Sequence, residues 1–334
     1  MEKQILLNED LLLDPWDILL HDSILVIANK DGVPLMELYD IYGNVGEKFL
    51  TKGNGPEEIS AVGGLHASVT NNNIYVYDLF RKRFLEFNIK KSSQSTFNPD
   101  AIYDYSKYLG LYQKDSSTVL FDKLLIGKDC LVGESRDPRG RVVLMNFDGN
   151  LINFVGDYPP KMYEELSDYG YVKLYASDFI LSNDASKLAL ASYSAEMIDI
   201  FDISKISAPK LVWSHQGFLP SDIYVFEMEN LTQAAFTKES RQGYSSIAAS
   251  DNFIYAIFSG RQIKEKNYSY GNIIRVVSWD GSKRFELQSD VDLKRITVSP
   301  DDQNIYAIAI DEADNPMVVV FNIKEIVDKM KNSH

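Results

Sequence analysis

Short runs of apolar residues recur along the chain in pairs, separated by turns rich in Ser, Asp and Asn. Such pairs are typical of antiparallel strands joined by tight turns. Six copies occur, the third weaker than the others: Trp16–Leu20 with Ile24–Ala28, Leu65–Val69 with Ile74–Tyr77, Leu120–Ile126 with Cys130–Glu134, Phe179–Ser182 with Lys187–Ala191, Ser246–Ala249 with Phe253–Phe258, and Ile296–Ser299 with Asn304–Ile310. Repetition of this kind indicates a repeat architecture.

A third strand with a similar ending follows each pair. These strands are Leu35–Ile41, Arg83–Ile89, Arg141–Phe147, Met197–Ile203, Ile273–Trp279 and Val318–Ile323. Turns such as Asp148-Gly149-Asn150 then lead into a fourth strand, as hairpin signals of the Asx-Gly type do. Six repeats of four strands predict an all-β chain: a six-bladed β-propeller that forms one domain over residues 1–334.

The two ends of the chain predict how the propeller closes. The sixth copy stops after its third strand, and residues Lys324–Lys331 then predict a short C-terminal helix. Residues Lys3–Asn8 form a spare strand before the first copy. We expect this N-terminal strand to complete the sixth blade, because closure of the ring removes both unpaired sheet edges.

Three connections are longer than a compact blade requires: Lys90–Thr118, Tyr158–Tyr175 and His215–Tyr244. Long connections in a compact fold are usually functional or disordered, and the aromatic content of these argues against disorder. Their aromatic residues are Tyr103, Tyr105, Tyr108, Tyr112, Tyr158, Tyr163, Tyr169, Tyr171, Phe218, Tyr224 and Phe226. Tyr105, Tyr169 and Tyr224 are candidate ligand contacts, since tyrosine suits stacking on sugars or gripping peptides. The alternative is that these rings pack within their own loops.

Loops between the second and third strands lie at the same face of a propeller as the connections between blades. Three of these loops are basic, with the candidate ligand-binding residues Arg81, Arg83, Arg136, Arg139 and Arg261, and with Lys82, Arg141, Lys264 and Lys266 beside them. We expect Arg81, Arg83, Arg136 and Arg261 to share one face and to favour an anionic ligand. The alternative is that they are solvated turn residues paired with nearby acids.

The segment Gly53-Asn54-Gly55-Pro56-Glu57-Glu58 predicts a defined turn before the second blade, near the channel mouth. A structural role for Gly53, Gly55, Pro56 and Glu57 is the stronger interpretation. Glu57, Glu58 and Asp178 are weak candidates for a calcium site, because calcium requires several converging oxygen ligands. No cofactor is otherwise expected.

Composition and charge exclude several classes of protein. The formal net charge of −14 disfavours binding to nucleic acid phosphates and to anionic lipids. Cys130 is the single cysteine, so an intramolecular disulfide is excluded. No apolar stretch approaches the ~20 residues of a membrane-spanning helix. The start of the chain lacks the features of a signal peptide, so the residues alone leave open a cytoplasmic protein or an exported one whose leader was removed.

Sequence motifs of catalysis are nearly absent. The four histidines are scattered, and the chain has no HExxH, GxSxG, P-loop or dinucleotide-binding motif. Cys130 lies in an apolar strand, where a thiol is usually unreactive. The residues therefore favour a protein without catalytic activity. The alternative is acid–base chemistry by carboxylates that are distant in sequence and meet at the channel.

Several motifs resemble the TolB-like six-bladed propellers of Bacteroidetes. The segment Lys52–Ile59 (KGNGPEEI) is similar to the Gly-x-Gly-Pro-x-Glu element of that group, and Ile74–Asp78 and Arg83–Phe87 follow it. The turn Val298-Ser299-Pro300-Asp301 is similar to strand turns of TolB-type propellers. The resemblance implies an exported protein of the periplasm or cell surface, often lipid-anchored on its precursor. It transfers no catalytic residue.

Three functions follow as hypotheses. The first is a non-catalytic propeller of the cell envelope that binds a glycan, a peptide or a protein at its loop-rich face. The second is a calcium-dependent lactonase or other hydrolase, or a lyase, with its site at the central channel. The third is a structural assembly subunit, which would carry a large apolar patch on a blade edge. The fold alone does not choose among them.

Overall fold

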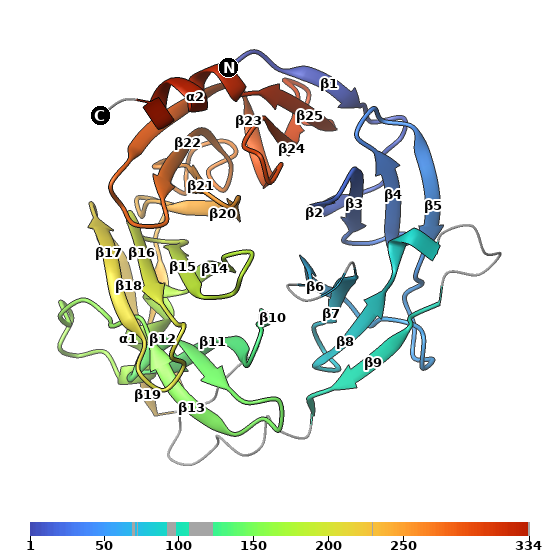
Figure 1. Cartoon of the computed structure of the whole chain (residues 1–334). Coiled ribbons are helices and arrows are strands. Elements are labelled where there is room, and N and C mark those ends of the chain that lie inside the picture. The colour runs from blue at the N-terminus through green and yellow to red at the C-terminus, as the bar shows by residue number, and fades with distance from the viewer. Residues whose placement is uncertain (69–70, 72, 92–97, 107–122, 229, 333–334) are drawn as a thin grey trace.

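A computed structural model describes residues 1–68, 71, 73–91, 98–106, 123–228 and 230–332. Antiparallel sheets stand around a central axis as blades (Figure 1), which confirms the predicted all-β propeller. In the described part of the chain, no helix is long and apolar enough to cross a membrane.

Each blade has four strands, the first innermost. Blade 1 contains β2 (Pro15–His21), β3 (Ile24–Asn29), β4 (Met36–Asp40) and β5 (Val45–Phe49), and blade 2 contains β6 (Val62–Ala67), β7 (Ile74–Asp78), β8 (Arg83–Phe87) and β9 (Ala101–Asp104). Blade 3 contains β10 (Leu124–Ile126), β11 (Leu131–Asp137), β12 (Gly140–Met145) and β13 (Leu151–Val155), and blade 4 contains β14 (Ser177–Leu181), β15 (Lys187–Ser192), β16 (Met197–Asp202) and β17 (Lys210–Gln216). Blade 5 contains β20 (Tyr244–Ala249), β21 (Phe253–Phe258), β22 (Gly271–Ser278) and the first part of β23 (Arg284–Val298), and blade 6 contains the second part of β23, β24 (Asn304–Ile310), β25 (Pro316–Asn322) and β1 (Gln4–Leu7).

The N-terminal strand closes the ring as predicted. Strand β1 pairs antiparallel with β25, with Gln4 opposite Val320 and Ile5 opposite Val319. Figure 1 shows β1 along the outer edge of the sixth blade, with the N-terminus beside α2 (Lys324–Asn332). The blade therefore combines the first strand of the chain with its last three, and the two ends stabilise each other.

Two connections differ from the sequence prediction. Strand β23 is continuous over 15 residues, so the fourth strand of blade 5 runs directly into the first strand of blade 6. The predicted connection Lys90–Thr118 contains β9, the fourth strand of blade 2. Residues 107–118 of this connection, which include Tyr108 and Tyr112, lie outside the described residues.

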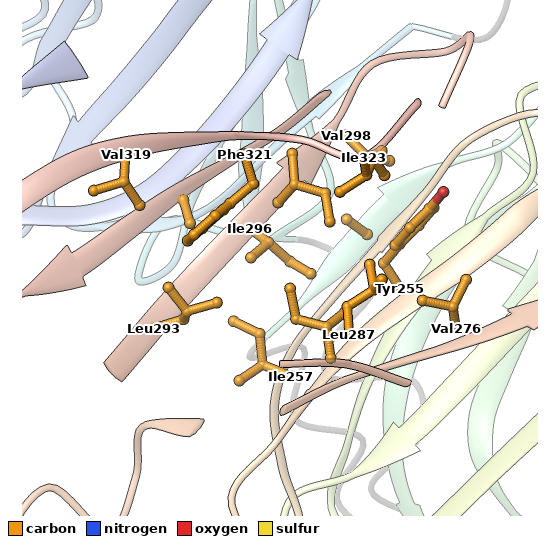
Figure 2. Packing of buried hydrophobic residues seen from close by; sticks show 14 of the residues in the cluster. Tyr255, Ile257, Val276, Leu287, Leu293, Ile296, Val298, Val319, Phe321 and Ile323 are labelled. Carbon is orange, nitrogen blue, oxygen red and sulfur yellow. The ribbon is translucent and has the colours of Figure 1, made fainter. Parts of the chain in front are cut away.

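Apolar side chains fill the spaces between neighbouring blades. The largest cluster lies between blades 5 and 6, where Ile257, Leu293, Ile296 and Phe321 are buried (Figure 2). Strands that are apolar on both faces, such as β21 and β24, sit between two such layers. Each blade thus packs on both of its neighbours, which explains the near-continuous apolar runs in the sequence.

A small cap lies on blades 3 and 4, built from the predicted connections Tyr158–Tyr175 and His215–Tyr244. It consists of α1 (Asp168–Val172) and the hairpin of β18 (Ile223–Met228) and β19 (Leu231–Phe236). Ser167 caps α1 and donates its hydroxyl to the Thr232 carbonyl at 2.7 Å. At Gly170 a Cβ atom would lie 2.5 Å from that carbonyl oxygen, so only glycine permits this close approach.

Candidate functional site

The inner strands of four blades carry a β-bulge near their first residues. The extra residues, at equivalent places in β2, β6, β20 and β23, are Trp16, Gly63, Ser245 and Lys294. A bulge bends the strand and redirects a side chain, and bulges are common beside functional sites. The inner strands begin where the connections between blades end. We call this end of the channel, which also carries the loops between second and third strands, the loop end.

The inner strands surround a central cavity of about 700 Å³. This is a size typical of small-molecule sites. Near the loop end its lining includes three carboxylates and three cations: Asp17, Glu134, Asp178, Lys123, Arg136 and Arg295. Tyr193, which directly follows β15, lines the same end. The cavity therefore presents mixed charge and a phenol within apolar blade walls.

Polar side chains join the inner strands of successive blades. Each accepts a hydrogen bond from a backbone N–H of the next inner strand: Asp17 from Leu65 (3.1 Å), His66 from Ile126 (3.1 Å), Asp178 from Ile247 (3.2 Å), Ser246 from Ile296 (3.3 Å) and Thr297 from Leu20 (3.0 Å). Between blades 3 and 4, Lys123 donates to Asp178 at 2.5 Å. Backbone N–H groups of the inner strands need hydrogen-bond acceptors, and these five side chains, which follow one another around the channel as a ring, supply them.

The two carboxylates of this ring, Asp17 and Asp178, each accept hydrogen bonds from more than one part of the chain. Asp17 and Asp178 each also accept the N–H of the residue that follows them, at 3.0 Å. Burial raises the pKa of Asp17, and the nearby Arg295 and Lys123 oppose this shift. The Oδ2 atom of each carboxylate therefore joins neighbouring blades, and the Oδ1 atom accepts a hydrogen bond from the next residue of its own strand.

His66 is neutral in the folded protein. Burial, together with Lys123, lowers the pKa of His66 to about 3, in agreement with the role of its Nε2 atom as a hydrogen-bond acceptor. In the unfolded chain a histidine takes up a proton near pH 6.5. Between these values the unfolded state binds the extra proton, so the contribution of His66 to stability is complete above pH 6.5 and decreases as the pH falls.

We expect the histidine to make the free energy of unfolding pH-dependent. Between pH 7.5 and 4.5 the loss of stability through His66 is about 2–3 kcal/mol. Urea unfolding of wild type and His66→Gln at several pH values measures it, since glutamine keeps an acceptor without titrating. The advantage of wild type over the variant should shrink by that amount at pH 4.5. A difference that stays constant from pH 7.5 to 4.5 would disprove the assignment.

Tyr193 is the group of the lining best placed to donate a hydrogen bond to a ligand. Burial and the charge of Asp178 raise its pKa well above the ordinary value, so the phenol stays protonated. Its backbone is fixed by hydrogen bonds to Ala176 and from Gly243. Among the described residues its hydroxyl has no hydrogen-bond partner, whereas the carboxylates beside it are engaged.

The five predicted arginines have partners within the protein. Arg81 and Arg83 donate to carbonyl groups of the turn at residues 53–58, and Arg83 also to Asp78. Arg139 binds Asp137 with two hydrogen bonds (2.7 and 2.6 Å), and Arg261 binds Asp292 likewise (2.8 and 2.5 Å). The Nη2 atom of Arg136 lies 3.7 Å from the Oε1 atom of Glu134.

These arginines do not gather around one site. Arg136 alone among them lines the central cavity. The neighbouring Arg141 is buried and paired with Asp199 of blade 4. The loops that carry them lie at the loop end, as the strand order requires, but their guanidinium groups bind acids and carbonyls of their own surroundings. Their role in binding a ligand stays a prediction.

The three predicted tyrosines lie in different surroundings. Tyr105 is buried between blades 2 and 3, and its ring packs on Phe84. Tyr169 lies on α1, with the Lys173 ammonium group 5.4 Å from its ring centre. Tyr224, on β18, is 65% exposed and stacks on Phe226. Of the three, Tyr224 therefore presents the most surface to a partner.

The turn at residues 53–58 is held by several contacts. The Gly55 N–H donates to the Glu58 carboxylate at 2.5 Å, and a Cβ atom at Gly53 would collide with the same carboxylate. Pro56 offers its carbonyl to Arg83, and Glu57 is exposed. None of these residues lines the central cavity, so the turn lies farther from the channel than the sequence suggests.

The weak metal candidates do not come together. In the described part of the chain, no group of three or more His, Cys, Asp and Glu side chains is arranged to hold a metal ion. Glu58 binds its own turn, and Asp178 is paired with Lys123. Cys130 is buried, and burial raises the pKa of its thiol to about 11, so the reactive thiolate is disfavoured.

Sequence reasoning missed the residues at the bulges. Trp16, Lys294 and Arg295 lie at the starts of two adjacent inner strands, although 278 residues separate Trp16 from Lys294 in the numbering. The signal was a tryptophan and a Lys-Arg pair at equivalent places in two repeats. It was overlooked because inner strands are usually read as core.

Comparisons with known proteins agree with this fold. A family model described as TolB-like 6-blade propeller-like matches residues 1–301. A member of the DUF4221 family from Bacteroides vulgatus is 13% identical, with a TM-score of 0.59, over 93% of each chain. A "putative exported protein" from Bacteroides fragilis is 10% identical, with a TM-score of 0.52, over 96% of this chain and 94% of that one. At such identities the likeness shows the fold alone. Among curated proteins, none matches the chain.

Proposed function

The chain belongs to the TolB-like six-bladed propeller family, and from this premise we propose that it is a non-catalytic binding module. Its ligand is a small polar molecule of the glycan class, which enters the central cavity from the loop end. The volume of about 700 Å³ suits a small ligand, or the end of a larger one, better than the surface of a folded protein.

One observation carries this proposal. Asp17, Asp178 and His66 of the lining use acceptor atoms to join the blades. The Tyr193 hydroxyl and the Nε and Nη2 atoms of Arg295, by contrast, have no acceptor among the described residues. These three acid–base groups are thus part of the scaffold. Donors suited to ligand hydroxyl and carboxylate groups line the cavity instead.

A location outside the cytoplasm follows as part of the proposal. The Bacteroides fragilis structure of similar fold is described as a "putative exported protein", and this likeness supports the envelope as the expected location of this chain. Fractionation of the source cells tests it, with the protein expected in the envelope fraction. Recovery in the cytoplasmic fraction alone would contradict it.

The first test of binding is a thermal-shift screen of the purified chain. We expect an oligosaccharide to raise the unfolding temperature by several degrees, since a ligand at 100-fold excess over Kd contributes about 2.7 kcal/mol. Neutral and acidic oligosaccharides, short peptides and calcium make up the screen. A response to calcium alone would favour the hydrolase alternative, and a response to peptides alone would replace the glycan.

Two variants locate the bound ligand. Tyr193→Phe removes one hydroxyl and should weaken binding about fivefold to tenfold, the effect of one neutral hydrogen bond. The control is Tyr224→Ser on the exposed hairpin, which should bind as wild type does. The opposite pattern, with Tyr224→Ser impaired and Tyr193→Phe normal, would move the site from the cavity to the cap.

A further inference from the structure

Three cations surround one indole ring at the loop end of the cavity, where blade 6 meets blade 1. The ring of Trp16 has the Arg295 guanidinium carbon at 5.1 Å, the Lys294 Nζ at 5.4 Å and the Lys30 Nζ at 5.8 Å from its centre. Trp16 and Lys294 are the bulge residues of their strands. Lys30 follows the second strand of blade 1. We call these four residues the Trp16 cluster.

The protein holds this cluster in place. Lys294 donates to the Pro15 carbonyl at 3.0 Å, across the junction between blades 6 and 1. Arg295 donates through Nη1 to the Ser245 carbonyl of blade 5 at 2.6 Å and to the Lys294 carbonyl at 3.1 Å. The positions of two of the cations are therefore fixed by backbone groups of three blades rather than by acidic side chains.

Positive charge at this place is unusual for the molecule. The chain has a formal net charge of −14, yet three cations gather here. Three acids also lie close to these cations: Asp14 to Lys294, Asp17 to Arg295 and Asp31 to Lys30. Asp17 is already bonded to two backbone N–H groups, and Asp31 is paired with Lys52. The indole face attracts cations and offsets part of their mutual repulsion. An anion bound among the three cations would offset the remaining repulsion.

The free edge of Arg295 indicates the shape of that anion. With Nη1 bonded to carbonyl groups, the Nε and Nη2 atoms, which lie on the other edge of the guanidinium, have no acceptor among the described residues. This edge matches the two oxygens of a carboxylate. Arg295 and Trp16 line the cavity itself, so a ligand there reaches both.

We propose that the Trp16 cluster is a subsite for a carboxylate, and that the ligand of the cavity is an acidic saccharide. This inference rests on the proposed function, which supplies the saccharide. The carboxylate binds the Nε–Nη2 edge of Arg295, with Lys294 and Lys30 beside it. Tyr193 and the polar groups of the lining contact the hydroxyl groups of the sugar.

Calorimetric titration with a matched pair of sugars tests the proposal. The pair is tri-galacturonate and the neutral trisaccharide obtained by reducing its carboxyl groups. Wild type should bind the acidic sugar about tenfold or more tightly, because hydrogen bonds to charged groups are the stronger ones. Arg295→Gln should abolish this preference and keep the weaker binding of the neutral sugar. Lys30→Gln should reduce the preference, and since Lys30 is exposed this change does not endanger folding.

A matched control comes from blade 5. The guanidinium group of Arg284 lies 5.9 Å from the ring centre of Trp213, on outer strands away from the cavity. Arg284→Gln removes the same charge from the same kind of ring contact. It should bind both sugars as wild type does.

A second measurement separates the proposal from the proposed function. Inorganic phosphate, compared with chloride at equal ionic strength, should change the tryptophan fluorescence of wild type and not that of Trp16→Phe. Equal affinity for both sugars with no phosphate response overturns the anion subsite while the binding function stands. A phosphate response without binding of either sugar supports the subsite and overturns the saccharide. A preference for the acidic sugar that survives in Arg295→Gln and Lys30→Gln also overturns the subsite.

Discussion

Removal of residues 1–8 lowers the unfolding temperature by about 10 °C or more, because it opens the ring at blade 6. The deletion removes the pairing of β1 with β25 and the side chain of Leu7, which is buried in the junction with blade 1. Burial of a leucine and several backbone hydrogen bonds together contribute about 5 kcal/mol. Differential scanning calorimetry measures the change.

Two single substitutions separate the loss of β1 from an effect of truncation. Leu7→Ala should cost about 2–5 kcal/mol, as in other buried positions. Ile5 lies two residues earlier on the same strand but is 54% exposed, so Ile5→Ala should change stability by less than about 0.5 kcal/mol. A truncated chain with the same unfolding temperature as wild type would show that closure of the propeller ring does not depend on β1.

Arg141→Met should destabilise the fold by about 3–5 kcal/mol, the cost of leaving a buried charge without its partner. Arg141 on β12 pairs with Asp199 on β16, so the ion pair joins blades 3 and 4. Both side chains are almost completely buried. Asp199 would keep its hydrogen bond from Ser214 (2.5 Å) but lose its cation. Urea unfolding measures the difference.

The double variant Arg141→Met/Asp199→Leu is the control for this prediction. Removal of both charges leaves apolar groups in a buried place, which often restores or exceeds the original stability. We therefore expect the double variant to be more stable than Arg141→Met alone. If the two losses simply add, the ion pair is not what joins the blades.

The repeat pattern was sufficient to predict the fold. Short apolar runs separated by polar turns located the inner strands to within a few residues, and the spare strand Lys3–Asn8 predicted the closure that β1 provides. The fusion of two strands into β23 was not predictable, because Ser289 to Val291 carry no apolar pattern and their extended backbone depends on both blades. Such continuity arises from tertiary packing rather than from local preference.

The candidate site was predicted only in part. Loop arginines were an obvious source of positive charge, yet acids close to them in the fold pair with them, as Asp137 does with Arg139. The Trp16 cluster was missed because its members come from opposite ends of the chain and meet only through ring closure. The bulges that redirect Trp16 and Lys294 depend on strand register, which near-continuous apolar runs do not specify.

A crystal structure of the chain with the oligosaccharide that raises its unfolding temperature most is the direct test of the binding site. We predict the sugar in the loop end of the cavity, with hydroxyl groups at Tyr193 and its carboxylate on the Nε–Nη2 edge of Arg295 beside Trp16. A sugar bound at the opposite end of the channel, beside Ser182 and Pro300, or on the exposed β18–β19 hairpin, would contradict this account.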